Sequence, residues 1–158
     1  MITLTGMTAP VLPDPATPFG QRVRARLQGD EVIWIVTVGS DGRPQPNPVG
    51  FCRDGDAEST EFVIYSRPDA RRLRHLRDRP DKVSFHFDSD GHGQDIVVLH
   101  GRVEVDHGHP AIQDWPPYLE KYGAAVERAF GSIAKFSESY PIALRVTITG
   151  VRGFYERG

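Results

Sequence analysis

Short runs of β-branched and aromatic residues, separated by Asp-Gly turns, constrain the fold of this chain more than any other feature. Three such runs occupy residues 31–38, 43–53 and 59–66, and the turns SDG and DGD at 40–42 and 54–56 separate them. Valine, isoleucine and aromatic residues favour strands, and Asp-Gly between two such runs is a strong hairpin signal. The pattern predicts a three-strand antiparallel meander.

The rest of the chain adds three more strands and three helices to this prediction. The further strand-like runs lie at residues 82–89, 94–106 and 141–155, and the helix-prone segments at 18–28, 68–79 and 111–140, the last interrupted at Pro116-Pro117 and Gly123. Antiparallel strands in this number favour a small closed barrel, because closure removes exposed sheet edges. The fold class that we predict is mainly β with helical insertions.

Length and composition favour one soluble domain. A chain of 158 residues with net charge −2 and a single cysteine is typical of a globular protein in a reducing compartment, so we expect a cytoplasmic protein. No run approaches the roughly 20 apolar residues of a membrane helix. Four prolines in the first 20 residues argue against a signal peptide, and we expect a flexible N-terminal arm over residues 1–17 before a single domain over 18–158.

Three prolines alternate in the second strand-like run. Pro44, Pro46 and Pro48 fall on one side of the pleat, where proline has no backbone N–H to donate. The start of this run is therefore expected to form a sheet edge that faces a ligand or a partner subunit instead of another strand.

An arginine-rich segment is the best candidate for a binding site. Residues 67–82 contain seven basic and three acidic residues, a local net charge of +4. Ser66 is expected just before the N-terminus of the helix over 68–79, where free N–H groups favour an anion, and Arg72 should lie beside the buried Leu73 and Leu76 and reach inward. The alternative is a solvated helix face. A nucleic-acid surface is disfavoured because no aromatic residues alternate with the arginines.

Other chemical motifs are weak. His107-Gly108-His109 lies near acidic residues, but a His-Gly-His in a loop is more often a surface turn, and no metal site is predicted. Cys52 is expected to be buried and inert. Phosphate-loop, dinucleotide and nucleophile-elbow patterns are absent, and no residue is assigned as a catalytic acid or base.

The order of the segments WIVTVGSDGRPQPNPVGF, FVIYSRPDARRLRHLRDRPDKVSFHFD, DIVVLHGRVEV and IALRVTITGVRGFY resembles the pyridoxamine 5′-phosphate oxidase-like superfamily over about residues 18–155. More narrowly, the chain is similar to the split β-barrel oxidoreductases that use the deazaflavin coenzyme F420, and WPPYLEKYG resembles an insertion of that group. The resemblance implies a homodimer of six-stranded antiparallel split β-barrels with two cofactor sites at the subunit interface.

The resemblance also implies which residues bind the cofactor. Ser66, Arg71 and Arg72 match the serine and basic pair that hold its phosphate, and Tyr65 and Arg67 flank that serine. The strand along the flavin or deazaflavin ring would consist of Gln45, Pro46, Asn47, Pro48 and Val49. The family commonly has lysine in place of Arg72 and asparagine in place of His75, and arginine at position 72 keeps the charge.

The sequence is compatible with three functional hypotheses. The first is an F420-dependent reductase that transfers a hydride to a small conjugated or quinone-like acceptor, in a pocket lined by Phe51, Tyr65, Trp34 or Trp115. The second replaces F420 with FMN, and the third is a flavin- or deazaflavin-binding protein without enzymatic activity. In all three the cofactor would supply the chemistry and the protein would orient it. Neither a membrane nor a nucleic acid is an expected partner.

Overall fold

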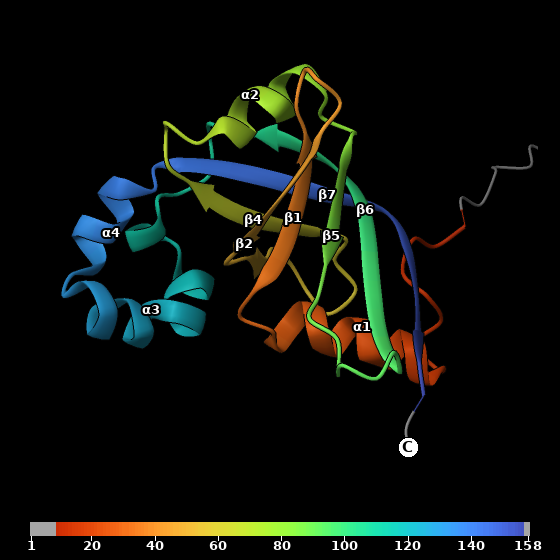
Figure 1. The fold of residues 1–158 in the computed structure, drawn as a ribbon. Helices are drawn as coiled ribbons and strands as arrows, with labels where there is room; N and C mark the ends of the chain where they lie inside the picture. Colours follow the sequence, from red (N-terminus) through yellow and green to blue (C-terminus); the bar gives the residue numbers. More distant parts are fainter. Residues whose placement is uncertain (1–8, 157–158) are drawn as a thin grey trace, which may run out of the picture.

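A single curved antiparallel sheet forms the centre of the computed structural model, which describes residues 9–156 (Figure 1). Within these residues the sheet has seven strands in the order β2-β1-β5-β6-β7-β4-β3. The strands are β1 (Ile33–Val38), β2 (Pro44–Val49), β3 (Cys52–Arg53), β4 (Glu61–Ser66), β5 (Val83–His86), β6 (Asp95–Val105) and β7 (Ile142–Tyr155). The mainly β class is confirmed, whereas the expected count of six strands becomes seven. The predicted closure is wrong, because β2 and β3 at the two ends of the sheet do not pair with each other. This open, curved sheet is called the barrel below.

The additional strand arises because the run over residues 43–53 breaks in two. β2 pairs only with β1, and β3 pairs only with β4 at the opposite edge of the sheet, so the predicted three-strand meander is wrong. The backbone N–H of Gly39 donates to Arg43 O, which sets the alternation of the β1–β2 ladder. In that alternation the nitrogens of the three prolines point away from β1, where no donor is required. The predicted edge strand is confirmed.

Four α-helices and one short 3₁₀-helix accompany the sheet in the part of the chain that the structure describes. They are α1 (Pro18–Gly29), α2 (Arg71–Asp78), α3 (Pro116–Phe130), α4 (Ile133–Ser139) and the 3₁₀-helix η1 (Ile112–Asp114). Helix α1 begins as predicted, with Pro18 in its first turn and the Thr17 hydroxyl accepting a hydrogen bond from Gly20 N at 3.0 Å. Figure 1 shows α1 and α2 at opposite ends of the sheet and α3 and α4 together at its side.

The segment over residues 111–140 is more regular than predicted. Pro116 and Pro117 do not interrupt a helix but begin α3, since the first turn of a helix needs no N–H donor there. Gly123 lies inside α3 without breaking it. The helix ends at Phe130 and is followed by Gly131, whose φ of 74° is a left-handed conformation that glycine adopts readily, and Ser132 then caps α4.

Side chains from the two faces of the sheet form two separate cores. Strand β4 is buried on both faces, with Phe62 and Ile64 in the barrel interior and Val63 and Tyr65 on the outer face. The outer core is completed by residues of η1 and α3, including Trp115 at the start of α3. The α3–α4 insertion therefore covers apolar surface that a barrel without the insertion would expose. Each apolar side chain buried in this way contributes about 1.5–3 kcal/mol to the free energy of folding.

Part of the expected N-terminal arm packs on the barrel. Residues 1–8 lie outside the described residues, but Leu12 is buried in the barrel core, and Pro13 O accepts a hydrogen bond from Arg24 at 2.7 Å. Over residues 9–156, no helix has the length and apolar character needed to cross a membrane.

Candidate functional site

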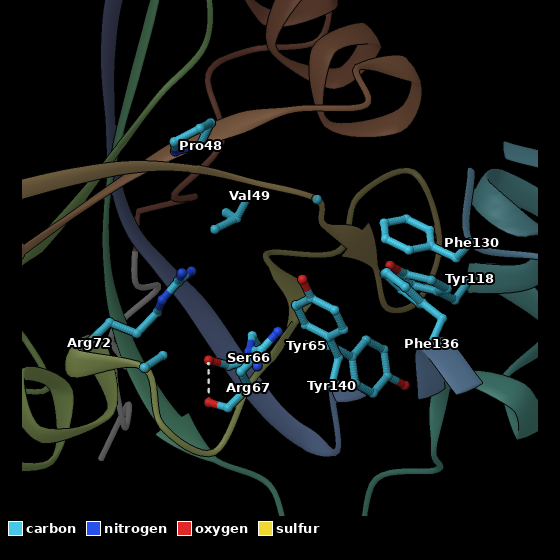
Figure 2. A pocket seen from close by; sticks show the side chains of 12 residues that line it. Pro48, Val49, Tyr65, Ser66, Arg67, Arg72, Tyr118, Phe130, Phe136 and Tyr140 are labelled. Carbon is cyan, nitrogen blue, oxygen red and sulfur yellow. Dashed lines mark hydrogen bonds between the residues drawn. The ribbon is translucent and has the colours of Figure 1, made fainter. Parts of the chain in front are cut away.

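A cavity of about 340 Å³ lies between the end of β2, the β4–α2 connection and the α3–α4 insertion (Figure 2). Six of the predicted cofactor-binding residues line it, from two stretches of the sequence, residues 48–49 and 65–72. These are Pro48, Val49, Tyr65, Ser66, Arg67 and Arg72. The other lining residues were not predicted: Gly50, Ala70, Tyr118, Phe130, Phe136 and Tyr140.

Arg72 provides the positive charge of this cavity. It lies in the first turn of α2, whose buried side carries Leu76, and its guanidinium extends toward the side of the cavity bounded by Val49 (Figure 2). It forms no ion pair with any carboxylate of residues 9–156. Burial lowers the pKa of Arg72, although the guanidinium stays charged. A half-buried cation without a counter-charge is suited to binding an anion.

The turn before α2 differs from the prediction. The helix begins at Arg71, not at Pro68, because residues 67–70 form a turn in which Ala70 N donates to Arg67 O at 3.3 Å. Ser66 therefore lies five residues before the helix instead of next to its N-terminus. Ser66 is 2% exposed and its hydroxyl donates to Arg67 O at 3.2 Å. The Arg67 side chain points outward and pairs with Asp69 at 3.3 Å.

Aromatic side chains from the α3–α4 insertion form the opposite wall of the cavity (Figure 2). The ring of Phe136 lies 4.8 Å from that of Phe130 and 4.6 Å from that of Tyr140, the latter stacked. Tyr118 contacts the ring of Tyr65 edge to face at 5.2 Å. The only signal for this wall was the resemblance of WPPYLEKYG to a subgroup insertion, because spacing alone could not place the helix beside β4.

Four predicted cofactor-binding residues do not line the cavity. Gln45, Pro46 and Asn47 lie farther along β2, on a strand that is mostly exposed at the sheet edge, and Arg71 is exposed on α2. Arg71 and Arg72 point in different directions since neighbouring residues on a helix are about 100° apart. The basic pair therefore divides into one residue at the cavity and one at the surface.

The four aromatic residues predicted to line an acceptor pocket do not come together at this cavity. Phe51 is fully buried in the barrel core, Trp34 is 37% exposed and bonds Asp88, and Trp115 packs under η1. Of the four residues, only Tyr65 reaches the cavity. Its hydroxyl donates to Pro110 O at 2.8 Å, and burial raises the pKa of its phenol well above the usual value.

His109, from the His-Gly-His segment at residues 107–109, contacts a group of paired charged side chains. His109 Nδ1 lies 3.3 Å from a guanidinium nitrogen of Arg145, which also pairs with Asp106 and Asp54 at 2.9 and 2.8 Å. Burial, and then Arg145, lower the pKa of His109. In the part of the chain that the structure describes, no cluster of three or more His, Cys, Asp or Glu residues could hold a metal ion.

The remaining departure from the family pattern, His75, connects α2 to the sheet. Its Nδ1 lies 2.9 Å from the hydroxyl of Thr37 on β1. This hydrogen bond fixes the orientation of the helix that carries Arg72. The cavity thus combines a positioned cation, backbone at the end of an edge strand and an aromatic wall, which together can accommodate a planar ring with an anionic group.

Comparison with solved structures identifies the fold. A conserved hypothetical protein from Mycobacterium tuberculosis matches with a TM-score of 0.59 at 18% identity, covering 97% of this chain and 91% of that one. An F420 reductase matches with a TM-score of 0.56 at 18% identity, covering 82% and 94%. A haem storage protein from Vibrio cholerae matches with a TM-score of 0.51 at 15% identity, covering 84% and 90%. Such identities establish a shared fold and no shared ligand.

Comparison of the sequence itself establishes the family. No curated protein matches the chain closely enough to count as a relative. The sequence profile described as pyridoxamine 5′-phosphate oxidase, however, matches residues 19–153, from the first turn of α1 to the last strand. This match includes all or most of every strand and every residue that lines the cavity. The chain therefore belongs to the pyridoxamine 5′-phosphate oxidase family.

Proposed function

We propose that this protein is an oxidoreductase that binds the deazaflavin coenzyme F420 and reduces a small conjugated or quinone-like acceptor. The observation that carries the proposal is the cavity in which the unpaired guanidinium of Arg72 faces an aromatic wall across the end of β2. The F420 reductase among the structural neighbours supports the choice of cofactor, since it shares the fold. A bound reduced deazaflavin would supply a hydride for transfer to the acceptor.

The residues of the cavity would bind and orient the two reactants. Arg72 would neutralise the cofactor phosphate, with Ser66 beside it at the start of the turn. Val49 and Gly50 line the cavity without long side chains, so a planar ring could lie against them. Tyr118 and Phe136 would exclude water and contact the ring or the acceptor. The protein would contribute orientation of the two reactants while the cofactor supplies the chemistry, and no acid or base is assigned.

We also propose that the protein is a homodimer and that the second subunit closes the cavity. Strand β2 has no neighbour on its outer side within residues 9–156, and its prolines prevent extension of the ladder there. A partner would therefore contact β2 through side chains. Size-exclusion chromatography with light scattering tests this, and a monomer with full cofactor affinity would contradict it.

The proposed cofactor is tested by equilibrium titration of purified protein with F420 and, separately, with FMN, followed by the cofactor's own fluorescence. Arg72→Gln should weaken F420 binding by about tenfold or more, because hydrogen bonds to charged groups contribute about 1.5–3 kcal/mol. The matched control is Arg74→Gln, which removes the same charge from an exposed position on the same helix. Equal affinities for the two variants would refute the role of Arg72.

The same titration separates the competing functions. Tight FMN binding with weak F420 binding would replace the deazaflavin with a flavin. F420 binding without reduction of any quinone or conjugated enone in a panel would indicate a binding protein and not an enzyme. Haem binding in place of both cofactors would relate this chain to its haem storage neighbour and would refute the proposal.

A further inference from the structure

A second cavity, of about 330 Å³, lies between the end of α1, strand β3 and the first turns of α3. It shares no lining residue with the cofactor cavity. Six of its lining residues are Gln28, Cys52, Arg53, Pro117, Glu120 and Lys121. Two of these are cations, and the function proposed above uses neither of them.

Arg53 is the buried cation of this cavity. It is 7% exposed, and its Nη1 donates to Ala57 O at 3.0 Å. Its Nε and Nη2 are buried and have no hydrogen-bond partner, and no carboxylate lies within 4.0 Å of the guanidinium, among the residues that the structure describes. A buried donor on a charged group that lacks a partner is strongly unfavourable, so the site is incomplete as it stands.

The two unpartnered nitrogens of Arg53 form the edge of the guanidinium that binds two oxygens at once. Arg24 shows the same edge in use, since its Nε and Nη2 donate to the two carboxylate oxygens of Glu58 at 2.7 and 2.8 Å. Arg53 presents this edge without any acidic residue on it. An oxyanion with two oxygens in one plane has the matching geometry.

Lys121 is the second cation and is also unpaired. Its Nζ donates to Phe51 O at 2.8 Å and lies 3.8 Å from the centre of the Phe51 ring, with no carboxylate within 4.0 Å across residues 9–156. Burial lowers the pKa of Lys121 to about 8, and Arg53 contributes to the same effect. Glu120 also lines the cavity, but its side chain is exposed and bonds neither cation.

We propose that this cavity binds a small oxyanion, a carboxylate or a phosphate, through the Nε and Nη2 edge of Arg53 and the ammonium of Lys121. Gln28 at the end of α1 lines the same cavity and carries an amide that can donate a hydrogen bond. Such a ligand would satisfy the buried donors of Arg53 and place a negative charge in direct contact with both cations, where the described residues place none within 4.0 Å. The inference is independent of the proposed function, because the two cavities have no residue in common.

The three lysines of the chain allow a local test by NMR. Protein labelled with ¹³Cε-lysine should give one signal each for Lys82, Lys121 and Lys135, and Lys121→Gln identifies the signal of the cavity. Inorganic phosphate and acetate are added in separate titrations at constant ionic strength. We expect a saturable shift of the Lys121 signal with at least one of them, while the other two lysines serve as internal references.

Variants then assign the response to Arg53. Arg53→Gln should weaken the response at least tenfold, and Arg53→Lys should also weaken it, because lysine keeps the charge but loses the paired donors. Arg72→Gln should leave the response of Lys121 unchanged, which excludes phosphate bound in the cofactor cavity. If Arg53→Gln does not fold, Arg53→Lys and the wild-type titration still decide. A shift common to all three lysines, an unsaturable shift or an undiminished response in the folded Arg53 variants would overturn the proposal.

Discussion

The hydroxyl of Tyr122 fixes the connection between the two halves of the broken strand, and its removal is the most informative single change. It accepts a hydrogen bond from Phe51 N at 3.0 Å and donates to Glu31 O at 2.6 Å, with Phe51 O also 3.0 Å away. Its oxygen also lies against Gly50, which lines the cavity that contains Arg72. Tyr122 thus joins α3 to the loops before β1 and before β3.

The expected cost of Tyr122→Phe follows from these contacts. Glu31 is exposed, so its carbonyl can bond water after the change, whereas Phe51 is fully buried and its N–H would lose its partner. One buried donor without a partner costs about 1–3 kcal/mol, and we expect the free energy of unfolding to fall by about 2 kcal/mol. For a domain of this size that corresponds to a decrease in Tm of about 4–8 °C.

Urea unfolding and amide hydrogen exchange test this reasoning together. The matched control is Tyr140→Phe, because the Tyr140 hydroxyl forms no hydrogen bond with any residue of the described part of the chain. Exchange at the Phe51 amide should accelerate in Tyr122→Phe and not in Tyr140→Phe. A stability loss equal in the two variants, or an unchanged Phe51 amide, would show that the hydroxyl does not hold this connection.

Two further predictions concern charged and reactive groups. Asp95→Asn should destabilise the fold by about 3 kcal/mol in urea unfolding, because Asp95 pairs with Arg22 and with the buried Arg26, at 2.6 Å from the latter. Arg22 and then Arg26 lower the pKa of Asp95, so the wild-type advantage should be complete above about pH 4 and disappear as the pH falls through the folded-state pKa. Cys52 is 5% exposed and burial raises its pKa to about 11, so iodoacetamide at pH 7.5 should modify it only slowly until urea unfolds the protein. Modification at the rate of a free thiol would contradict this.

The sequence correctly predicted those helices and strands that are determined by neighbouring residues in the chain. Helix α1 begins where Thr17 and Pro18 indicate, and the β-branched runs all form strands. The alternating prolines correctly predicted an edge, since a missing donor is a property of the residue itself. The spacing of Arg72 from Leu76 correctly predicted that Arg72 lies on the inward side of its helix, where it lines the cavity.

Long-range pairing explains the errors. Nothing within residues 43–53 shows that the chain must leave one edge of the sheet and rejoin at the other, because that depends on β5, β6 and β7 filling the space between. The Asp-Gly turn at 54–56 does join two paired strands, but β3 has only two residues. The aromatic wall of the cavity was missed for the same reason. Helical periodicity shows which side of a helix is apolar, but it does not show which part of the protein that side contacts.

The contrast between Arg24 and Arg53 shows why binding sites are harder to read from a sequence than folds. Acidic residues lie near both arginines, and no local pattern in the sequence shows which of the two forms an ion pair. Arg24 meets Glu58, which is 34 positions away, and its charge is compensated within the protein. Arg53 is enclosed by the strand and helix around it and meets none. A cation that can bind an anion is one without a carboxylate partner in the protein. Whether an arginine has such a partner depends on how distant segments pack, and the local sequence does not show this.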